Sequence, residues 1–410
     1  MAALPTEIIA EILCMLPVKT LIRFLCVSKS WLSLIKSPKF IKQHLNRTLK
    51  FNSHRHLLLT YSTLSSSTIN RQFKFSKLNH PLKLKFPENH HEKKPCPLGG
   101  PFESCPFEPS SKTNIIFWGS CNGVICISDA KRNDVVLFNP ATKTYRNLPA
   151  TEYPCPKEFA VFGLGYDSES DDYKVLRMMQ CVGPNDEIKN DARVYSLKSN
   201  SWRRVSDIPY SLIFPDTHGV FVNGSLHYVV SEIPFQSEYK SIAKFDLKTE
   251  SYSLLDCPDY DHSMRCWTLY LGDLGGRLSC SVNYDFHGSA DVWIMDEYGK
   301  KDSWIRLLRI SKMEKETILI DVKAIAWCNN GKMILTVVDN ELRWYDMRGR
   351  RGIRAGVLEG MPGENFEAGT YVESLVMLDE EKVTNIVAGS TRKDKVEKPG
   401  GGTTTRKGKK

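Results

Sequence analysis

Apolar residues in the first 50 positions recur every three or four residues in four short groups, which predicts four short helices. The first predicted helix follows Pro5 and ends before Pro17, because proline suits the first turn of a helix and interrupts its interior. The third follows Ser28, a residue type that commonly caps helices, and ends at Ser37–Pro38. Such short helices enclose a core too small to be stable alone, so we expect part of their apolar surface to face a partner.

From about residue 55 the pattern changes to short runs of β-branched and aromatic residues bounded by turn residues, which predicts strands. The clearest runs are Ile125–Ile127, Val175–Met178, Val220–Val222, Leu226–Val230, Ile242–Phe245, Val292–Met295 and Met333–Val338. No long amphipathic helix is predicted between residues 55 and 380.

Turn signals recur through this region at intervals of 50 to 55 residues. They are Asn122–Gly123, Asp171–Asp172, Asn223–Gly224, Gly275–Gly276 and Asn330–Gly331. After three of these turns comes an aromatic residue, a polar turn and a second aromatic residue, at Phe138–Tyr145, Tyr195–Trp202 and Phe245–Tyr252. A period near 50 with about four short strands per unit is typical of a β-propeller blade. We interpret the recurring aromatic residues Trp202, Tyr252 and Trp304 as core residues and not as ligand-stacking residues.

The predicted fold class is therefore α+β in two domains. A small N-terminal all-helical domain at 1–50 precedes an all-β, propeller-like domain of about five to six irregular blades at 51–385. The proline-rich stretch 84–112 is predicted to be an irregular loop. The basic tail at 386–410 is predicted to be disordered.

Five repeats are visible, and a sixth, degenerate repeat is predicted within 55–85. The strand-like segment Tyr371–Leu378 is predicted to return to the first blade and close the ring. Closure of this kind buries the blade faces, which no single blade can bury alone.

The composition, with 41% apolar and 25% charged residues, is ordinary for a globular protein. The net charge of +9 is unevenly distributed, because residues 1–50 and residues 391–410 each carry +6. The region between them therefore carries −3, which disfavours a broad nucleic-acid-binding surface there.

The twelve cysteines are too sparse for a disulfide framework, and neither a signal peptide nor a membrane-spanning run of about 20 apolar residues is visible. We therefore expect free thiols, a cytoplasmic and/or nuclear location, and no membrane association. Cys14 and Cys26 are predicted to be small core residues, and Cys121 and Cys126 to pack within a hairpin.

Four N-terminal segments carry a recognisable motif: Leu4–Leu13 (LPTEIIAEIL), Leu16–Phe24 (LPVKTLIRF), Cys26–Trp31 (CVSKSW) and Ser37–Phe40 (SPKF). They resemble the F-box. The remainder resembles the F-box-associated domain of the large plant F-box/kelch-like family, on Gly119–Val124, Asn139–Thr142, Gly163–Asp167, Asp172–Val175 and Tyr371–Leu375. The doubled glycines of true kelch repeats occur in a blade-like place only at Gly275–Gly276.

This resemblance implies a substrate-recognition subunit of an SCF-type E3 ubiquitin ligase that is not itself an enzyme. The F-box would dock on a Skp-family adaptor, which links to cullin and RING subunits, and the β domain would recruit a target protein for ubiquitination. No catalytic residue, metal or cofactor is implied. By motif position, the Skp-docking and core residues are Leu4, Pro5, Ile8, Ile9, Leu13, Leu16, Pro17, Leu21, Val27 and Trp31.

The target itself is unknown from the sequence. Loops on a rigid scaffold often carry recognition, so we expect the target to bind one loop-lined end of the propeller. Four segments interrupt the repeats and are the candidates: 149–160, 180–192, 231–241 and 256–266.

Two other functions stay open. A propeller-fold enzyme would need acids or metal ligands that converge at the ring centre. No spacing supports such a set among Asp171, Asp172, Asp256, Asp259, Asp261 and His262. A DNA-binding regulator could use the basic residues of the first 50 positions, yet no helix there carries a cluster of base-reading side chains.

Two further motifs are weaker. His90, His91, Cys96 and Cys105 lack the paired spacing of a structural zinc site, so they are predicted to be loop residues. Gly163-Leu-Gly165 lacks the third glycine and the following helix of a dinucleotide-binding motif, and is interpreted as a strand end before a turn.

Overall fold

Among the described residues, the four α-helices precede all of the strands, as the sequence pattern predicts. The computed structural model describes residues 4–51, 54–65, 68–77, 115–129, 135–151, 160–182, 188–213, 218–233, 240–260, 266–284, 288–311, 321–328, 332–339, 341–347, 354–357, 366–378 and 381–382. The four helices are α1 (Thr6–Leu13), α2 (Val18–Phe24), α3 (Lys29–Lys36) and α4 (Pro38–Lys50). We call residues 4–51 the helical module. The predictions at 84–112 and at 386–410 lie outside the described residues.

The helix boundaries have the local causes that the sequence indicates. Pro5 and Pro17 stand at the N-caps of α1 and α2. The Ser28 hydroxyl accepts a hydrogen bond from the backbone N–H of Trp31 at 3.2 Å and so caps α3. Ser37 caps α4 in the same way, and Pro38 follows at the first helical position.

The strands of the described residues form six antiparallel sheets, which we number in ring order. Sheet 1 contains β24 (Phe366–Val372), β1 (Arg55–Ser65) and β2 (Thr68–Lys77). Sheet 2 contains β3 (Ile115–Cys121), β4 (Val124–Asp129), β5 (Val135–Asn139), β6 (Thr144–Asn147) and β25 (Glu381–Lys382). Sheet 3 contains β7 (Ala160–Asp167), β8 (Asp172–Val182), β9 (Ile188–Ser196) and β10 (Ser201–Arg204).

The other three sheets repeat this arrangement. Sheet 4 contains β11 (Ser211–Leu212), β12 (Val220–Val222), β13 (Ser225–Ser231), β14 (Lys240–Asp246) and β15 (Tyr252–Leu255). Sheet 5 contains β16 (Cys266–Asp273), β17 (Leu278–Tyr284), β18 (Ser289–Met295) and β19 (Trp304–Ser311), with the short helix η3 (Lys301–Ser303) before β19. Sheet 6 contains β20 (Val322–Cys328), β21 (Met333–Val338), β22 (Glu341–Asp346) and β23 (Arg354–Val357).

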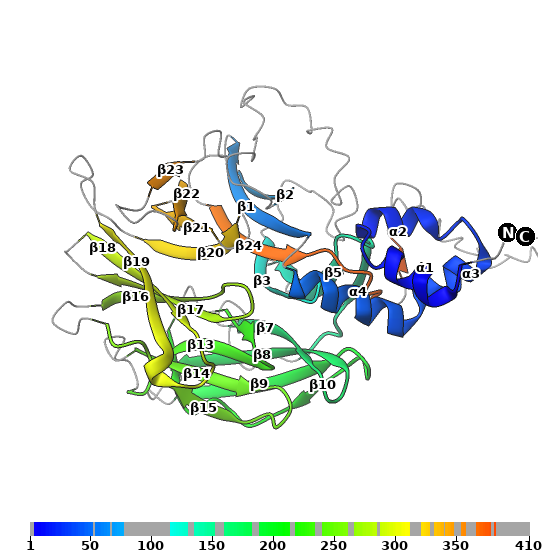
Figure 1. Cartoon of the computed structure of the whole chain (residues 1–410). Coiled ribbons are helices and arrows are strands. Elements are labelled where there is room, and N and C mark those ends of the chain that lie inside the picture. Colours follow the sequence, from blue (N-terminus) through cyan, green and yellow to red (C-terminus); the bar gives the residue numbers. More distant parts are fainter. Residues whose placement is uncertain are drawn as a thin grey trace, which may run out of the picture.

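The six sheets are the blades of a closed ring. Strand β3 contacts β7, β7 contacts β12, β12 contacts β16, β16 contacts β20, β20 contacts β24, and β24 contacts β3. Figure 1 shows the blades gathered into one body, with the four helices together at one side of it. The predicted fold class, a helical domain followed by an irregular propeller, is therefore confirmed, and the degenerate repeat at 55–85 supplies two strands of blade 1.

The ring closes earlier along the chain than Tyr371–Leu378 predicts. Strand β24 pairs with β1 and ends at Val372, so only the first two residues of the predicted strand belong to it. Residues 373–378, which we call the C-terminal strap, leave blade 1 and run across blade 2. Buried polar groups of blade 2 hold the strap backbone there, in place of a strand partner in blade 1.

The recurring aromatic residues are cross-strand pairs. Phe138 lies opposite Tyr145, and Phe245 lies opposite Tyr252 with ring centroids 4.8 Å apart. Tyr195 and Trp202 are paired in the same way at 5.4 Å. Each pair packs within or against a hydrophobic cluster, which agrees with a core role.

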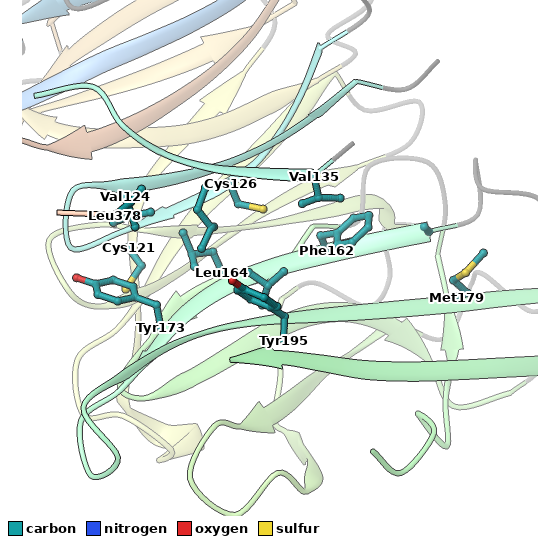
Figure 2. Packing of buried hydrophobic residues seen from close by; sticks show 13 residues of the cluster. Cys121, Val124, Cys126, Val135, Phe162, Leu164, Tyr173, Met179, Tyr195 and Leu378 are labelled. Carbon is teal, nitrogen blue, oxygen red and sulfur yellow. The ribbon is translucent and has the colours of Figure 1, made fainter. Parts of the chain in front are cut away.

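Hydrophobic clusters fill the spaces between blades. The cluster in Figure 2 joins Cys121 and Cys126 of blade 2 to Phe162 and Tyr195 of blade 3. Burial raises the pKa of both thiols, as expected of packed cysteines in an apolar core. Cys181 is disulfide-bonded, so the prediction of free thiols is wrong at that position.

Gly163 lies inside β7 and not at a strand end as predicted. Its backbone forms a parallel bridge with Gly219, which directly precedes β12 of blade 4. A Cβ atom on Gly163 would stand 2.4 Å from the hydroxyl oxygen of Tyr228. Glycine is therefore required because two blades approach closely at this point.

His227 is buried in blade 4 as a neutral imidazole. Its Nδ1–H donates to the Val220 carbonyl at 3.0 Å, which leaves Nε2 to accept from the Tyr298 hydroxyl at 2.8 Å. Burial lowers the pKa of His227 from 6.5 to about 4. The unfolded chain therefore binds a proton between these two values that the folded chain does not bind.

We expect this burial to weaken the protein as the pH falls. The contribution of His227 is fully present above its unfolded pKa of 6.5 and is lost as the pH approaches about 4. The loss is on the order of 1.4 kcal/mol per pH unit in that window. Urea unfolding followed by tryptophan fluorescence measures it, with His227→Gln as the non-titrating control. An identical pH dependence in the variant would contradict this account.

Candidate functional site

Helix α1 carries two adjacent apolar stripes. Ile9, Leu13 and Leu16 form the inner stripe and pack in the core of the helical module. Ile8 and Ile12 follow at helical spacing on the neighbouring stripe, and both are about half exposed. One apolar stripe is enough to attach a helix to its own core, so the second is available to a partner.

We call the exposed side chains of Leu4, Ile8, Ile12 and Met15 the outer stripe. They succeed one another at intervals of three or four residues, so they lie along one side of α1 and its flanking residues. Met15 is 57% exposed and Leu4 is 61% exposed. Large apolar side chains left in water in this number mark an interaction surface.

The ten residues predicted for docking and core divide into three groups in the structure. Leu13 and Leu21 are fully buried and serve the core. Ile9, Leu16, Pro17 and Trp31 are half-buried. Leu4, Pro5, Ile8 and Val27 are exposed, and these four are placed where a partner could reach them.

Motif matching missed two exposed residues of the same stripe, Ile12 and Met15. The width of the apolar face could have identified them. Three other apolar residues of α1 already pack in the core, so further apolar residues on this helix are more than its own core requires. Cys26 was predicted to be a core residue but is exposed. It follows the end of α2, where its thiol donates to the Arg23 carbonyl at 3.0 Å.

The interior of the helical module also holds polar groups. His44 is buried, and its Nε2–H donates to the Leu16 carbonyl at 2.9 Å, which ties α4 to the connection between α1 and α2. Burial lowers the pKa of His44. Burial also raises the pKa of Cys14 to about 11, so that thiol is an inert packing group.

The helical module rests on the ring at the turns of blades 2 and 3. Its core includes Leu375 of the strap, with Ala141 of the β5–β6 turn packed against the same cluster. Lys42 of α4 forms an exposed ion pair with Asp171 in the β7–β8 turn at 3.5 Å. We call this the helical end of the ring.

The described strand ends that border the predicted target segments in blade 3 lie at the opposite end of the ring. The β7–β8 turn lies at the helical end, so Ala160 and Val182, at the other ends of these paired strands, lie at the far end. The parallel bridge between Gly163 and Gly219 shows that the chain entering β12 runs in the same direction as β7. The β12–β13 turn of blade 4 therefore also lies at the helical end.

Four stretches, 152–159, 183–187, 234–239 and 261–265, join strand ends at that far end. They lie outside the described residues. Within the predicted segment 180–192, however, 180–182 and 188–192 belong to β8 and β9, so its loop is shorter than expected.

One linked set of charges lies between blades 3 and 4. The Lys174 ammonium donates to Asp167 and Glu250 at 3.0 Å each and to the Leu247 carbonyl at 2.7 Å. Burial raises the pKa of Asp167, but hydrogen bonds from Ser170 and Lys174 outweigh it and lower the pKa to about 2. These groups satisfy one another and hold two blades together.

Two of the described acids that were considered for an enzyme have separate partners. Asp171 accepts from Tyr166 at the helical end, whereas Asp259 pairs with Lys301 beyond the end of β15. Asp261 and His262, like the histidines and cysteines of 90–105, lie outside the described residues. Among the residues that the structure describes, no group of three or more His, Cys, Asp or Glu could hold a metal ion. No helix in that part of the chain is long and apolar enough to cross a membrane.

Comparisons with known proteins match both parts of the chain to known domain families. Residues 1–43 match the F-box domain, and residues 102–378 match the F-box associated beta propeller domain. The chain belongs to the F-box proteins with an F-box associated β-propeller domain. The second match ends at Leu378, the last residue of the strap.

Relatives of this F-box protein align over most of its length. F-box protein CPR1 of Arabidopsis thaliana is 30% identical, over 86% of this chain and 84% of the relative. F-box protein At4g22390 of Arabidopsis thaliana is 29% identical, over 92% and 91%. Among solved structures, an oligogalacturonate lyase from Vibrio parahaemolyticus covers 58% of this chain and 62% of its own at 5% identity and a TM-score of 0.38, too low to argue from.

Substitution by Asp at two neighbouring residues of α1 should change the stability of the F-box by very different amounts. Leu13→Asp buries an unpaired charge in the F-box core and should destabilise it by about 3 kcal/mol or more. Ile12→Asp is half exposed and should change stability by less than about 0.5 kcal/mol. Hydrogen exchange of the helix amides measures both. Equal effects would mean that the outer stripe is part of the fold.

Proposed function

We propose that this F-box protein is the substrate-recognition subunit of an SCF-type E3 ubiquitin ligase. The F-box docks on a Skp-family adaptor, and through it on cullin and RING subunits. The propeller binds a target protein and brings it to the ubiquitin-transfer machinery. The contribution of the chain is proximity, which raises the effective concentration of the target near that machinery.

The observation that carries this proposal is the exposed outer stripe on a helix of the F-box. Helical interfaces draw most of their binding energy from a few large side chains that become buried. Ile8 and Ile12 are large, adjacent on the helix and free of any role in the F-box core. We propose that they enter a hydrophobic groove of the adaptor, with Leu4 and Met15 at either end.

A non-catalytic role is part of the proposal. The charges of Lys174, Asp167 and Glu250 between blades 3 and 4 are satisfied by one another, and the roles assigned to the exposed side chains are those of binding. The family match of residues 1–43 accounts for the N-terminal helices as an F-box and leaves the DNA-binding alternative without support. We also propose a cytoplasmic and/or nuclear location, on the low density of cysteines in the sequence.

Charge on the outer stripe should strongly weaken adaptor binding. The double variant Ile8→Asp and Ile12→Asp is expected to weaken the complex with a plant Skp-family adaptor by about a hundredfold or more, because two buried apolar contacts are lost. Co-expression followed by size-exclusion chromatography and calorimetry measures it. Leu254→Asp, at a similarly exposed leucine on β15, is the control and should bind normally. A folded double variant that still binds with full affinity would rule out this docking surface.

We further propose that the target binds at the far end of the ring. The helical end is partly occupied by the F-box, through Leu375, Ala141 and Asp171. The four candidate segments all join strand ends on the other side. A target held there would project away from the F-box.

Replacing the far-end segments should remove target binding and spare adaptor binding. We would exchange 152–159, 183–187, 234–239 and 261–265 in turn for Gly/Ser linkers of equal length. At least one exchange should reduce recovery of the target in a quantitative pull-down by about tenfold or more, with an unchanged amount of adaptor. A matched exchange of Lys198–Ser199 at the helical end is the control. Unchanged target binding in all four would disprove the assignment.

A further inference from the structure

We propose that the C-terminal strap fixes the F-box to the propeller, and that Leu375 is the positioning residue of this joint. The strap would then set the direction from the outer stripe to the far end of the ring. The effect on ubiquitin transfer rests on the proposed function, whereas the joint itself does not. Four independent features of residues 373–378 lead to this inference.

The first feature is the alternation of side chains along the strap. Ser374 and Leu378 are buried against the ring, and Val376 packs on the cluster between blades 2 and 3. Leu375 points the other way, into the F-box, and Met377 is 44% exposed. This is the two-residue period of an extended chain between two bodies. Figure 2 shows Leu378 beside Val124 in the blade cluster.

The second feature is the way blade 2 holds the strap backbone. The fully buried Asn139 amide donates to the Val376 carbonyl at 2.7 Å and to the Ser374 carbonyl at 3.1 Å. The Thr144 hydroxyl accepts from the N–H of Leu378 at 3.1 Å. Buried hydrogen bonds of this kind fix the chain in one position, because breaking one leaves a buried polar group unsatisfied.

The third feature is the tight approach of the strap to the β3–β4 turn. Gly123 has a φ of +85°, and a Cβ atom there would stand 2.2 Å from the Ser374 hydroxyl oxygen. Only glycine allows both that backbone conformation and that contact. The strap is therefore enclosed by the two turns of blade 2, one formed at Asn122–Gly123 and one at Asn139–Thr144.

The fourth feature is the place of Leu375 in the F-box. It is 5% exposed and belongs to the same core cluster as Leu13, Val18, Ile35 and Phe40. Those four residues come from four different helices. A leucine from the far end of the sequence therefore completes the core that the short helices cannot fill alone.

Together these features explain why three family segments far apart in the sequence meet in space. Gly119–Val124 contains the glycine that the strap approaches, Asn139–Thr142 contains the asparagine that binds the strap backbone, and Tyr371–Leu375 contains the first three residues of the strap. The F-box of this chain is then not an autonomous module on a free linker. Its core is shared with the propeller, and its orientation is fixed by that sharing.

The test compares two neighbouring positions of the strap in the full chain. Leu375→Asp should raise the exchange rates of the α1–α4 amide hydrogens by about thirtyfold or more, since a buried leucine contact is lost. Small-angle X-ray scattering should show an increased maximum dimension, as the F-box leaves the ring. Exchange in blades 3 to 5 should stay unchanged.

Three further variants make the result specific to position. Leu375→Met should restore wild-type exchange and scattering, because it keeps an apolar side chain of similar volume. Met377→Asp, exposed on the same strap, should behave as wild type. Ala141→Asp charges the same joint from the propeller side and should reproduce the Leu375→Asp effect if that variant fails to fold. Unchanged exchange and scattering in Leu375→Asp, or an equal effect of Met377→Asp, would overturn the proposal.

Adaptor binding separates this proposal from the proposed function. Leu375→Asp leaves the outer stripe intact, so the variant should still bind the Skp-family adaptor while its scattering shows a loose joint. Normal joint behaviour in a wild-type chain that does not bind the adaptor would refute the ligase role and leave the strap in place. Loss of adaptor binding in every strap variant, Leu375→Met included, would mean that residue 375 belongs to the docking surface.

Discussion

The pairing of β1 with β24 is the interaction on which the remaining structure depends. These strands lie more than 300 residues apart in the sequence, yet they are neighbours over seven residue pairs in blade 1. Without that pairing, blade 1 would consist of a single hairpin, and the faces of blades 2 and 6 beside it would be exposed. Closure is entropically costly because it joins distant parts of the chain, so it requires contacts on both sides of the joint.

The same pairing also determines where the F-box lies. Helix α4 ends at Lys50, four residues before β1, and the strap begins directly after β24. Both connections therefore leave blade 1 at the same end of the ring, where the backbone N–H of Glu373 donates to the His54 carbonyl at 3.0 Å. The short connection to β1 therefore restricts the helices to packing at that end. The core that they form there includes Leu375 because the strap passes directly beside them.

Much of this architecture could be predicted from the sequence, because it depends on local signals. Helix caps at Ser28 and Ser37, and the recurring turn pairs, report the backbone conformation of the residues that carry them. The strap could not be predicted in this way. Its residues have strand-like composition, and what keeps them out of blade 1 is the buried amide of Asn139, more than 230 residues earlier. Docking residues likewise cannot be separated from core residues by composition, because Ile12 and Leu13 are both apolar and differ only in the direction in which they point from one helix.

The two apolar stripes of α1 now have different explanations. The inner stripe packs on helices that would be unstable alone, and the strap from the propeller compensates for their small number. This compensation covers only the side of the F-box that faces the ring. The outer stripe on α1 remains uncovered by either body. We therefore propose that the surplus of apolar residues in the first 50 positions serves two interfaces, one with the propeller and one with the adaptor, and that the first fixes the direction of the second.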